Sequence, residues 1–514
     1  MPKPPDYGII YNWDGAPHGY SQVPQSLEEF LDKMYAPIEG TQVGAHFWCT
    51  GEHTSRWKSG ALEMIGGGAG RTYENASTYI FCENVLQMLE RGEDPQTEAI
   101  RRGRELGLHV YASIRMNDNH FDGAQIEDLP TLKHTSLTTM RREHPHWLLG
   151  EKTSDWFALS WNLEVPEVRE HRFTHIKELC EMYDWDGVEL DWQRHAFHLA
   201  DDFGFRLRYV ITDLARAVRN MTNDLAKKRG RPFYVAARVS GSFEGCRHIG
   251  YDIPAWVDEG LVDILIPSGG SGSDPDVEVE RFVELCRPAG IAVYPALYGS
   301  NPDPHVGPED VYCRHVMRSR AVAARYHASG GTGVYVFNYH ADRKSRRELL
   351  TQMGTPQTLR KRDKIYSATY RNLRRSGPWR NAEKYDRMRG TTPVALKKTF
   401  TGEGPEIPLD VIDDVAADDA GSIELRVRIK EWVHGDQVSV LWDGAQLDDA
   451  VVSYDRSNPI SDVSANVLIC FTLSREQAAM GPHTAKVVLS ERNPRVTSDP
   501  VLTHVDLVIR YRTS

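Results

Sequence analysis

The sequence lacks a long apolar run and a cysteine framework. No stretch approaches the ~20 consecutive apolar residues that cross a bilayer, and the first residues, Met1-Pro2-Lys3-Pro4-Pro5-Asp6, contain no apolar leader core. The 7 cysteines are scattered without a CxxC pair, and an odd number cannot form a complete set of disulfides. We therefore expect a cytoplasmic protein without a membrane partner, unless a signal peptide has already been removed.

Positive charge is also in short supply. The chain has 61 Lys and Arg against 72 Asp and Glu, a net charge of −11. Nucleic acid is therefore not expected as a partner, because neutralising phosphates requires a basic surface. There is no HExxH spacing, no Ser-His-Asp nucleophile elbow and no GxGxxG after a strand. The sequence thus gives no reason to expect a cofactor, and it leaves oligomeric state open.

What the chain does contain is a regular alternation of short β-branched or aromatic runs with helical segments, which is typical of a parallel sheet wrapped by helices. Eight such runs make a (β/α)8 TIM barrel the economical α/β fold. The eight runs are residues 7–11, 42–48, 109–115, 187–192, 234–239, 262–267, 292–297 and 333–338.

The composition changes after residue 340. Residues 341–394 are rich in Lys and Arg, and we interpret them as a basic helical connector, although a tail that binds an anionic polymer is an alternative. From residue 395 alternating strands predict an antiparallel β-sandwich accessory domain that extends to residue 514. The predicted division is therefore a barrel over 1–340, a connector over 341–394 and a sandwich over 395–514.

The fourth run carries the main chemical signal. In Asp186-Gly187-Val188-Glu189-Leu190-Asp191 two carboxylates stand two residues apart on a strand, so both point to the same side. Val188, Leu190 and Trp192 alternate with them, which predicts a buried strand. Two inward carboxylates cost several kcal/mol unless they are paired or functional. We therefore interpret Glu189 and Asp191 as a catalytic pair, with a buried salt bridge to Arg194 or another arginine as the alternative.

Polar and aromatic residues follow nearly every predicted strand. Because the carboxyl ends of parallel strands form the functional face of a TIM barrel, these side chains are expected to meet in one pocket. Carboxylates, amides, arginines and aromatic platforms suit a polyhydroxylated substrate. The candidates beyond the pair are Asn12, Trp48, Glu52, Arg115, Asn117, Asp118, His120, Trp192, Arg194, His195, Arg238, Tyr298, Asn338 and His340.

The segment from Asp186 to Gln193 resembles the DGxDxDxE motif of family 18 chitinases, with Gln193 at the position of their catalytic acid. It is also similar to the GFRxDxxxH strand of α-amylase-type barrels, which would place Asp191 at the nucleophile position and Glu189 at that of the arginine. Together with Arg115-Met116-Asn117-Asp118-Asn119-His120 and the segment from Met353 to Tyr366, it resembles bacterial family 10-like glycosyl hydrolases over residues 5–370. The resemblance implies a barrel hydrolase without a defined substrate.

These observations predict a glycoside hydrolase that cleaves an oligosaccharide or glycoside. Asp191 is the expected nucleophile or base, Glu189 its partner or the general acid, and Asp118 the alternative acid; Glu244 is a weaker candidate. One rival is a metal-dependent lyase, isomerase or hydrolase on the same barrel, with Asp118, His120 and His340 among its ligands. The other is a carbohydrate-binding protein without catalysis, which Gln193 would permit.

Overall fold

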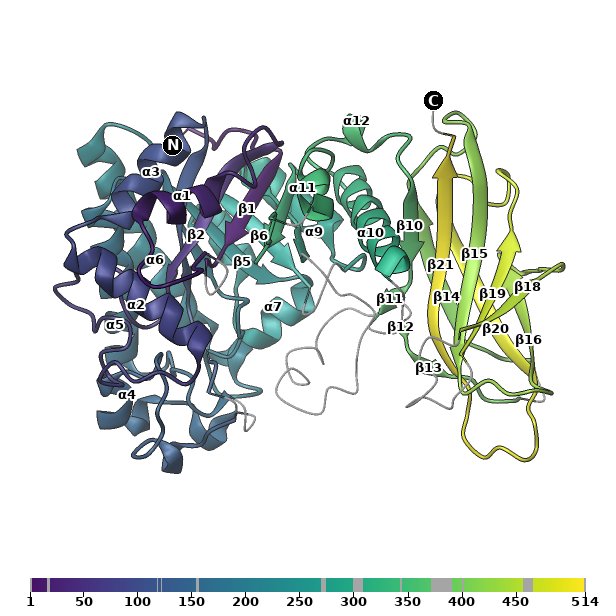
Figure 1. The fold of residues 1–514 in the computed structure, drawn as a ribbon, viewed down its shortest axis with the longest axis horizontal. Coiled ribbons are helices and arrows are strands. Elements are labelled where there is room, and N and C mark those ends of the chain that lie inside the picture. Colours follow the sequence, from purple (N-terminus) through teal and green to yellow (C-terminus); the bar gives the residue numbers. More distant parts are fainter. Residues whose placement is uncertain are drawn as a thin grey trace.

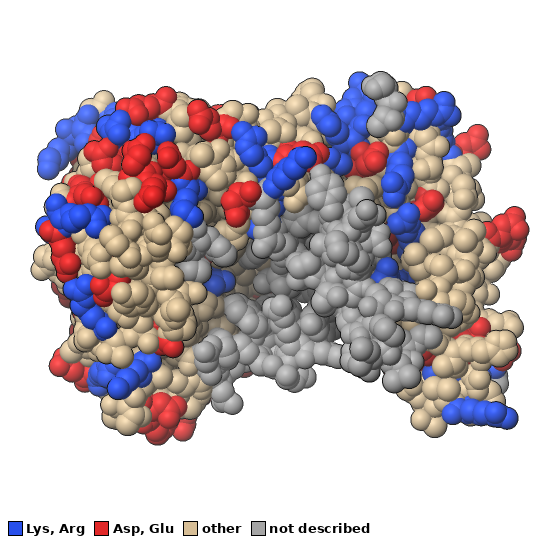
Figure 2. All heavy atoms as spheres, in the orientation of Figure 1, with Lys and Arg blue, Asp and Glu red and all other residues tan. Residues whose placement is uncertain are grey.

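The computed structural model describes residues 2–15, 19–117, 119–121, 123–153, 157–269, 274–298, 308–342, 344–370, 391–399, 402–455 and 466–512. A barrel and a β-sandwich lie side by side, with helix α10 (Pro308–Ala328) between them (Figure 1). On the face shown in Figure 2, acidic and basic side chains are intermixed over the described part of the barrel. Within the described residues, no helix is both long and apolar enough to span a membrane.

The barrel sheet is entirely parallel, with strand order β7-β6-β5-β4-β3-β2-β1-β9-β8. Every strand predicted from the sequence is present, so the TIM-barrel prediction is confirmed. The strands are β1 (Ile9–Trp13), β2 (Val43–Gly51), β3 (His109–Arg115), β4 (Gly187–Asp191), β5 (Tyr234–Ser240), β6 (Ile264–Ser268), β7 (Ala292–Val293), β8 (Ala296–Tyr298) and β9 (Val334–Phe337).

The barrel closes through a strand that is divided in two. Proline cannot donate a ladder hydrogen bond, and Pro295 separates β7 from β8 within the predicted strand 292–297. The Tyr294 N–H still donates to the Leu265 carbonyl (3.0 Å), and the Tyr335 N–H donates to the Pro295 carbonyl (3.0 Å). These two bonds connect the β6 side to the β9 side, so the nine strand segments form one ring.

The helices cover the outside of the ring and have clear start and stop signals. For example, α3 begins after the N-cap Asp94 with Pro95 in its first turn, and Gly107 follows it with φ +79°. The helices of the barrel, besides α10, are α1 (Leu27–Tyr35), α2 (Ala76–Glu90), α3 (Pro95–Glu105), α4 (Thr139–Glu143), α5 (Pro166–Met182), α6 (Gly204–Arg229), α7 (Phe243–Ile249), α8 (Ile253–Asp258) and α9 (Val279–Ala289).

The C-terminal domain consists of two antiparallel sheets, in the orders β10-β21-β15-β19-β18 and β14-β20-β16-β17, with β13 beside β21. Their inner faces share one apolar core that includes Leu425, Val487 and Leu507, so the predicted β-sandwich is confirmed. The strands are β10 (Lys364–Ser367), β13 (Val394–Ala395), β14 (Glu406–Val411), β15 (Ala420–Lys430), β16 (Gln437–Trp442), β17 (Ala445–Gln446), β18 (Val451–Asp455), β19 (Asn466–Thr472), β20 (Gly481–Glu491) and β21 (Val501–Tyr511).

The segment predicted as a connector contributes to both domains. Helices α11 (Lys344–Leu350) and α12 (Pro356–Leu359) follow the barrel, and β10 then pairs antiparallel with β21 inside the sandwich. The short strands β11 (Thr369–Tyr370) and β12 (Thr391–Thr392) pair with each other. On the side facing the sandwich, α10 packs Met317 against Ile365 and Val508, and Arg318 pairs with Asp506 at 2.9 Å.

Candidate active site

The inner face of the barrel changes character along its axis. Because side chains alternate on a strand, Tyr111, Ser113 and Arg115 of β3 all point inward, as do Glu189 and Asp191 of β4. The deeper positions are apolar and aromatic, and they form a buried cluster with Tyr7 and Tyr234. The polar and charged side chains stand at the carboxyl ends of the strands, which is the face where barrel enzymes bind their substrates.

Asp191 forms a bidentate ion pair with Arg238 from the adjacent strand β5. The Arg238 Nε donates to Oδ1 at 2.8 Å and its Nη2 to Oδ2 at 3.0 Å. Oδ1 also accepts the backbone N–H groups of Gln193 (3.2 Å) and Arg194 (3.1 Å). Both partners are fully buried. Asp191 is therefore in a buried salt bridge, as the alternative interpretation predicted, and its partner is Arg238 instead of Arg194. The bidentate pair fixes the orientation of the carboxylate.

Arg238 is held from two further sides. Its guanidinium carbon lies 3.7 Å from the ring centroid of Phe337, and its Nη1 donates to Ser268 Oγ at 3.1 Å. A guanidinium that is stacked and hydrogen-bonded in this way has little rotational freedom. The arginine therefore presents a fixed positive charge beside Asp191.

Glu189 lies one inward position deeper on β4 and has no exposed surface. Tyr335 Oη donates to its Oε1 at 2.7 Å, and Asn12 Nδ2 donates to its Oε2 at 3.2 Å. Burial, together with the nearby Asp191 carboxylate, raises the pKa of Glu189 to about 7. Near neutral pH the two carboxyl groups of β4 thus stand in different environments, one facing a guanidinium and one able to keep its proton.

Arg115, at the end of β3, draws the ends of other strands together. Its Nη2 donates to Asp14 Oδ2 (3.1 Å) and to Asn338 Oδ1 (3.2 Å), and its Nη1 donates to Glu52 Oε1 (3.3 Å). Arg56 is a second partner of Glu52 at 3.2 Å. The Asp14 and Glu52 side chains each retain 14% exposure. They therefore form the accessible rim above the buried pair.

The loops after β3 and β4 contribute His120 and His195, whose tautomers are defined by their neighbours. The Asn119 N–H donates to Nδ1 of His195 at 2.8 Å, so the proton of the neutral ring lies on Nε2. Arg194 donates to Nε2 of the exposed His120 at 3.0 Å, and the two imidazoles meet edge to face at 4.8 Å. His195 has φ +61° and Asn338 has φ +43°, a left-handed conformation that is uncommon for non-glycine residues and that Asn and His adopt more readily than most.

Some predicted residues lie elsewhere. Trp48 and Trp192 have the opposite strand parity and pack in the layer between strands and helices, Trp48 against Phe30 and Trp192 beside Trp256. Neither can stack on a ligand inside the barrel. Asn117 uses its amide to join loops, donating to the carbonyls of Trp161 and Phe197 and accepting the Trp161 N–H.

The remaining predictions can be placed only in part. Asp118 lies outside the described residues, and so does the Tyr298 side chain, although the Tyr298 backbone pairs with Phe337 at the end of β8. His340 is half-buried and follows β9 by three residues. Glu244 is exposed on α7, where it contacts His248 at 2.7 Å.

Sequence reasoning missed Tyr335, although its inward-facing position on β9 could have identified it as a partner for a buried acid.

Sequence reasoning also missed a buried cluster around Arg172 that contacts the loop of Glu52. Arg172 of α5 donates to the Glu52 carbonyl, to His53 Nδ1 (2.9 Å) and to His175 Nδ1, and no carboxylate pairs with it among the described residues. Burial lowers the pKa of Arg172 to about 10 and that of His175 well below its usual range. This cluster holds the loop that positions Glu52.

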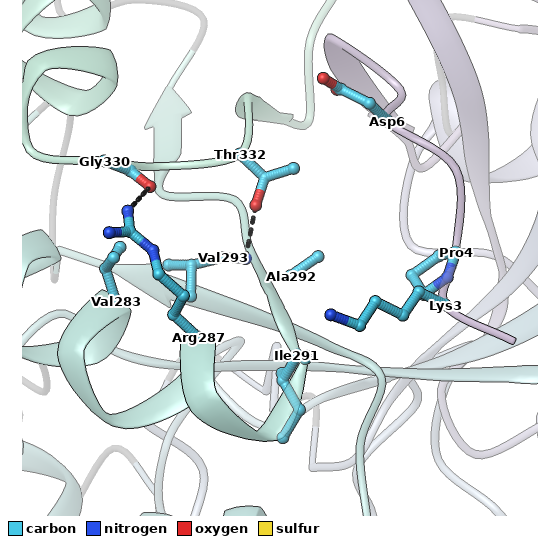
Figure 3. Close-up of a pocket in the computed structure, with 11 residues that line it drawn as sticks. Lys3, Pro4, Asp6, Val283, Arg287, Ile291, Ala292, Val293, Gly330 and Thr332 are labelled. Atoms are coloured by element: carbon cyan, nitrogen blue, oxygen red, sulfur yellow. Dashed lines mark hydrogen bonds between the residues drawn. The ribbon is translucent and has the colours of Figure 1, made fainter. Parts of the chain in front are cut away.

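The structure was also searched for a metal site and for a pocket elsewhere on the barrel. Within the described residues, no group of three or more His, Cys, Asp or Glu side chains is arranged to hold a metal ion. A pocket of about 240 Å³ opens at the opposite, amino end of the strands, between Lys3, Asp6 and Arg287 (Figure 3). It therefore does not adjoin the carboxylate pair.

Comparison with known proteins assigns no family. No family model and no curated protein matches the chain. Among solved structures, it is similar to a cycloisomaltooligosaccharide glucanotransferase from Paenibacillus sp. (TM-score 0.36, 10% identity, 97% of this chain and 57% of that chain). It is also similar to an α-amylase from Anoxybacillus (0.36, 12%, 99% of both chains) and a family 18 N-acetylglucosaminidase from Paenibacillus barengoltzii (0.35, 12%, 68% and 99%). The chain spans little more than half of the glucanotransferase, and TM-scores this low define neither activity nor substrate.

Proposed function

We propose that the protein is a glycoside hydrolase. The observation that carries this proposal is the pair of inward carboxyl groups on β4, which occupy different environments at the functional end of a TIM barrel. Asp191 faces Arg238 and two backbone N–H groups, whereas the pKa of Glu189 is raised to about 7 by burial and by Asp191. Carboxyl groups with separated proton affinities are the usual apparatus of glycoside cleavage. The resemblance to family 10-like glycosyl hydrolases predicted for residues 5–370 stays a prediction, because no family model matches the chain.

Asp191 is proposed as the nucleophile or base, because it is the inward residue nearest the open end of β4. Arg238 and the N–H groups of the following loop would hold its carboxylate in a fixed orientation. Glu189 is proposed as its partner. It lies one inward position deeper on β4, where Tyr335 and Asn12 donate hydrogen bonds to its carboxyl oxygens. It would hold or release a proton as the charge on Asp191 changes during the reaction. The general acid must reach the leaving oxygen; Glu189 is one candidate for that role and Asp118 is the alternative.

Substrate hydroxyl groups would be held by the polar side chains around the rim. Arg115, Asn338 and Arg194 supply donors, His120 and His195 supply imidazole N–H groups at the positions set by their tautomers, and Glu52 supplies an acceptor. Such fixed donors and acceptors match a polyhydroxylated ring. His340 and Tyr298 complete the proposed set at the ends of β9 and β8.

The test is a hydrolysis screen over a panel of oligosaccharides and aryl glycosides, with product analysis. The wild type should cleave at least one member. Glu105→Gln is the matched control, since that carboxylate is exposed at the end of α3, forms a surface ion pair with Arg101 and should be dispensable. A panel left intact by a folded wild type would contradict the proposal, as would full activity of Asp191→Asn. Inhibition by a chelator, reversed by added metal, would instead favour the metal-dependent rival.

A second candidate function is carbohydrate binding without catalysis. It is favoured by Gln193, an amide at the position where the similar chitinase motif has its acid. Binding of a glycan by isothermal titration, with no product after prolonged incubation, would support this candidate over the hydrolase.

A further inference from the structure

Strand β18 (Val451–Asp455) forms an exposed edge of the sandwich. It pairs with β19 and with no other strand among the described residues, and it lies on the side of the sandwich away from the barrel (Figure 1). Its side chains Val451 (69%), Val452 (49%) and Tyr454 (56%) are exposed large apolar groups. The outward N–H and C=O groups of such a strand are a template on which another strand can add.

The other edges of the two sandwich sheets are protected. Strand β10 is packed against α10, whose Met317 contacts Ile365. Strand β14 contains Pro408, which has no N–H to donate to another strand, and β17 has only two residues, Ala445 and Gln446. Natural proteins avoid edge-to-edge association through such features. Strand β18 has five residues and no proline, lysine or arginine, so it is the edge that can accept a partner strand.

The strand is complementary to a second copy of itself. Two antiparallel copies are related by a two-fold axis perpendicular to the sheet, and each residue must oppose one whose side chain points to the same face. Since side chains alternate along a strand, the axis has to pass beside a residue and not between two. An axis at Ser453, the middle residue, pairs all five residues of β18. Val452 then lies opposite Tyr454 on both sides of the axis, and such pairs of β-branched and aromatic residues stabilise antiparallel strands.

The charges next to the strand favour the same register. Asp449 precedes β18 and Asp455 ends it. An axis at Val452 would place Asp449 opposite Asp455, and like charges directly opposite each other are destabilising. With the axis at Ser453, the two copies of Asp449 lie at opposite ends of the paired strands. No carboxylate of β18 or its flanks then faces another.

We propose that β18 binds β18 of a second copy of this chain by antiparallel strand addition, centred on Ser453, so that one sheet runs through both sandwiches. The occupant is a second copy because this strand alone supplies the backbone partners, the side-chain pairs and a register without facing charges. A five-residue strand buries less area than a permanent interface needs, so the dimer should be reversible, with a Kd on the order of 10 µM. The dimer is independent of the proposed function.

The first test is sedimentation equilibrium of the intact protein, from about tenfold below to about tenfold above that Kd. The wild type should change from monomer to dimer over this range. Val452→Lys/Tyr454→Lys and, separately, Ser453→Lys place lysines opposite one another, so each should raise Kd at least about tenfold. Ala445→Lys, on the protected edge β17, is the matched control and should dimerise like the wild type. Melting curves establish that each variant is folded.

The second test determines the register by disulfide crosslinking. Directly opposed residues in an antiparallel pair have Cα atoms about 4.5–5.5 Å apart, a separation that a disulfide spans. Ser453→Cys should therefore form a covalent dimer under mild oxidation. Val452→Cys is the control, because its two copies would be diagonal neighbours roughly 7–8 Å apart, too far for a disulfide. The wild type, treated in parallel, shows whether its own cysteines crosslink.

Three results would overturn the proposal. The first is a wild type that stays monomeric over the whole concentration range, and the second is a dimer whose Kd is unchanged in both lysine variants. The third is a crosslink through Val452→Cys in place of Ser453→Cys, which would show a different register. Dimerisation does not require turnover, so a wild type that cleaves no glycan would contradict the hydrolase and leave this proposal standing.

Discussion

The two halves of the barrel interior are built on the same strands and are equally buried, yet their chemistry differs. In the amino half, Tyr7 and Tyr111 share a hydrogen bond between their hydroxyl groups (2.9 Å), and Tyr294 accepts the Tyr7 N–H (2.9 Å). In the carboxyl half, Asp191 and Arg238 form an ion pair without solvent exposure. In the amino half the buried polar groups are satisfied by hydrogen bonds between neutral hydroxyl groups. In the carboxyl half each buried charge needs a partner of opposite charge.

The difference shows what burial alone demands. A closed barrel can be filled with apolar and tyrosine side chains at low cost, so the inward charges of the carboxyl half are not required for packing. They stand where loops can supply partners and where a ligand can enter. The predictions below test this contrast, beginning with the largest expected effect.

Asp191→Asn should reduce turnover of any cleaved glycoside by at least about 10³-fold, because the amide can act neither as a nucleophile nor as a base. The measurement is kcat on the best substrate of the panel. Asn is nearly isosteric, so a melting curve distinguishes lost chemistry from lost structure. Near-normal kcat would remove Asp191 from the catalytic assignment and leave it only the ion pair.

Arg238→Met should lower the free energy of unfolding by about 3–5 kcal/mol, since it leaves the buried Asp191 carboxylate without its cation. Urea denaturation measures this loss. The double variant Asp191→Asn/Arg238→Met is the control and should recover part of it, because no uncompensated charge remains. Equal stability of both variants would mean that solvent reaches Asp191.

Glu189→Gln should make stability less dependent on pH. The pKa of Glu189 is raised in the folded protein to about 7, above its value in the unfolded chain. The protonated form therefore stabilises the fold at low pH, and this contribution is lost as pH rises through about 7. Between pH 5 and pH 9 the wild type should lose on the order of 3 kcal/mol relative to Glu189→Gln, measured by denaturation at each pH. Parallel curves would show that Glu189 is already ionised at pH 5.

The same substitution in the two halves should have unequal consequences. Tyr335→Phe removes the hydroxyl group that donates to Glu189, so it should shift the pH profile of kcat and cost about 1–3 kcal/mol of stability. Tyr111→Phe should cost about 1 kcal/mol and leave the profile unchanged, because Tyr7 keeps its bond to His109. Matching pH profiles for the two variants would show that the hydroxyl on Glu189 has no role in proton transfer.

Much of the fold could be predicted because hydrophobic alternation identified all the barrel strands and the longer strands of the sandwich, such as β15 and β21. The entry of β10 into the sandwich could not, since it depends on the distant partner β21. The division of one strand at Pro295 could have been predicted, because proline lacks the N–H that a ladder hydrogen bond needs. Within the site, the parity of β4 correctly paired Glu189 with Asp191. The same rule, applied to β2 and β4, would have excluded Trp48 and Trp192. Arg172 was beyond prediction, because two of its partners, Glu52 and His53, lie in the loop after β2, far from α5 in the sequence.

Helix α10 belongs to two hydrophobic cores at once. Val322 and Ala323 lie in the barrel core, while Met317 and Ala321 pack with the sandwich. A protein truncated after the barrel would expose that second apolar surface to water, and the isolated sandwich would lose its cover over β10. The two domains should consequently unfold in a single cooperative transition, so that heat or denaturant damage to either one is transmitted to the other.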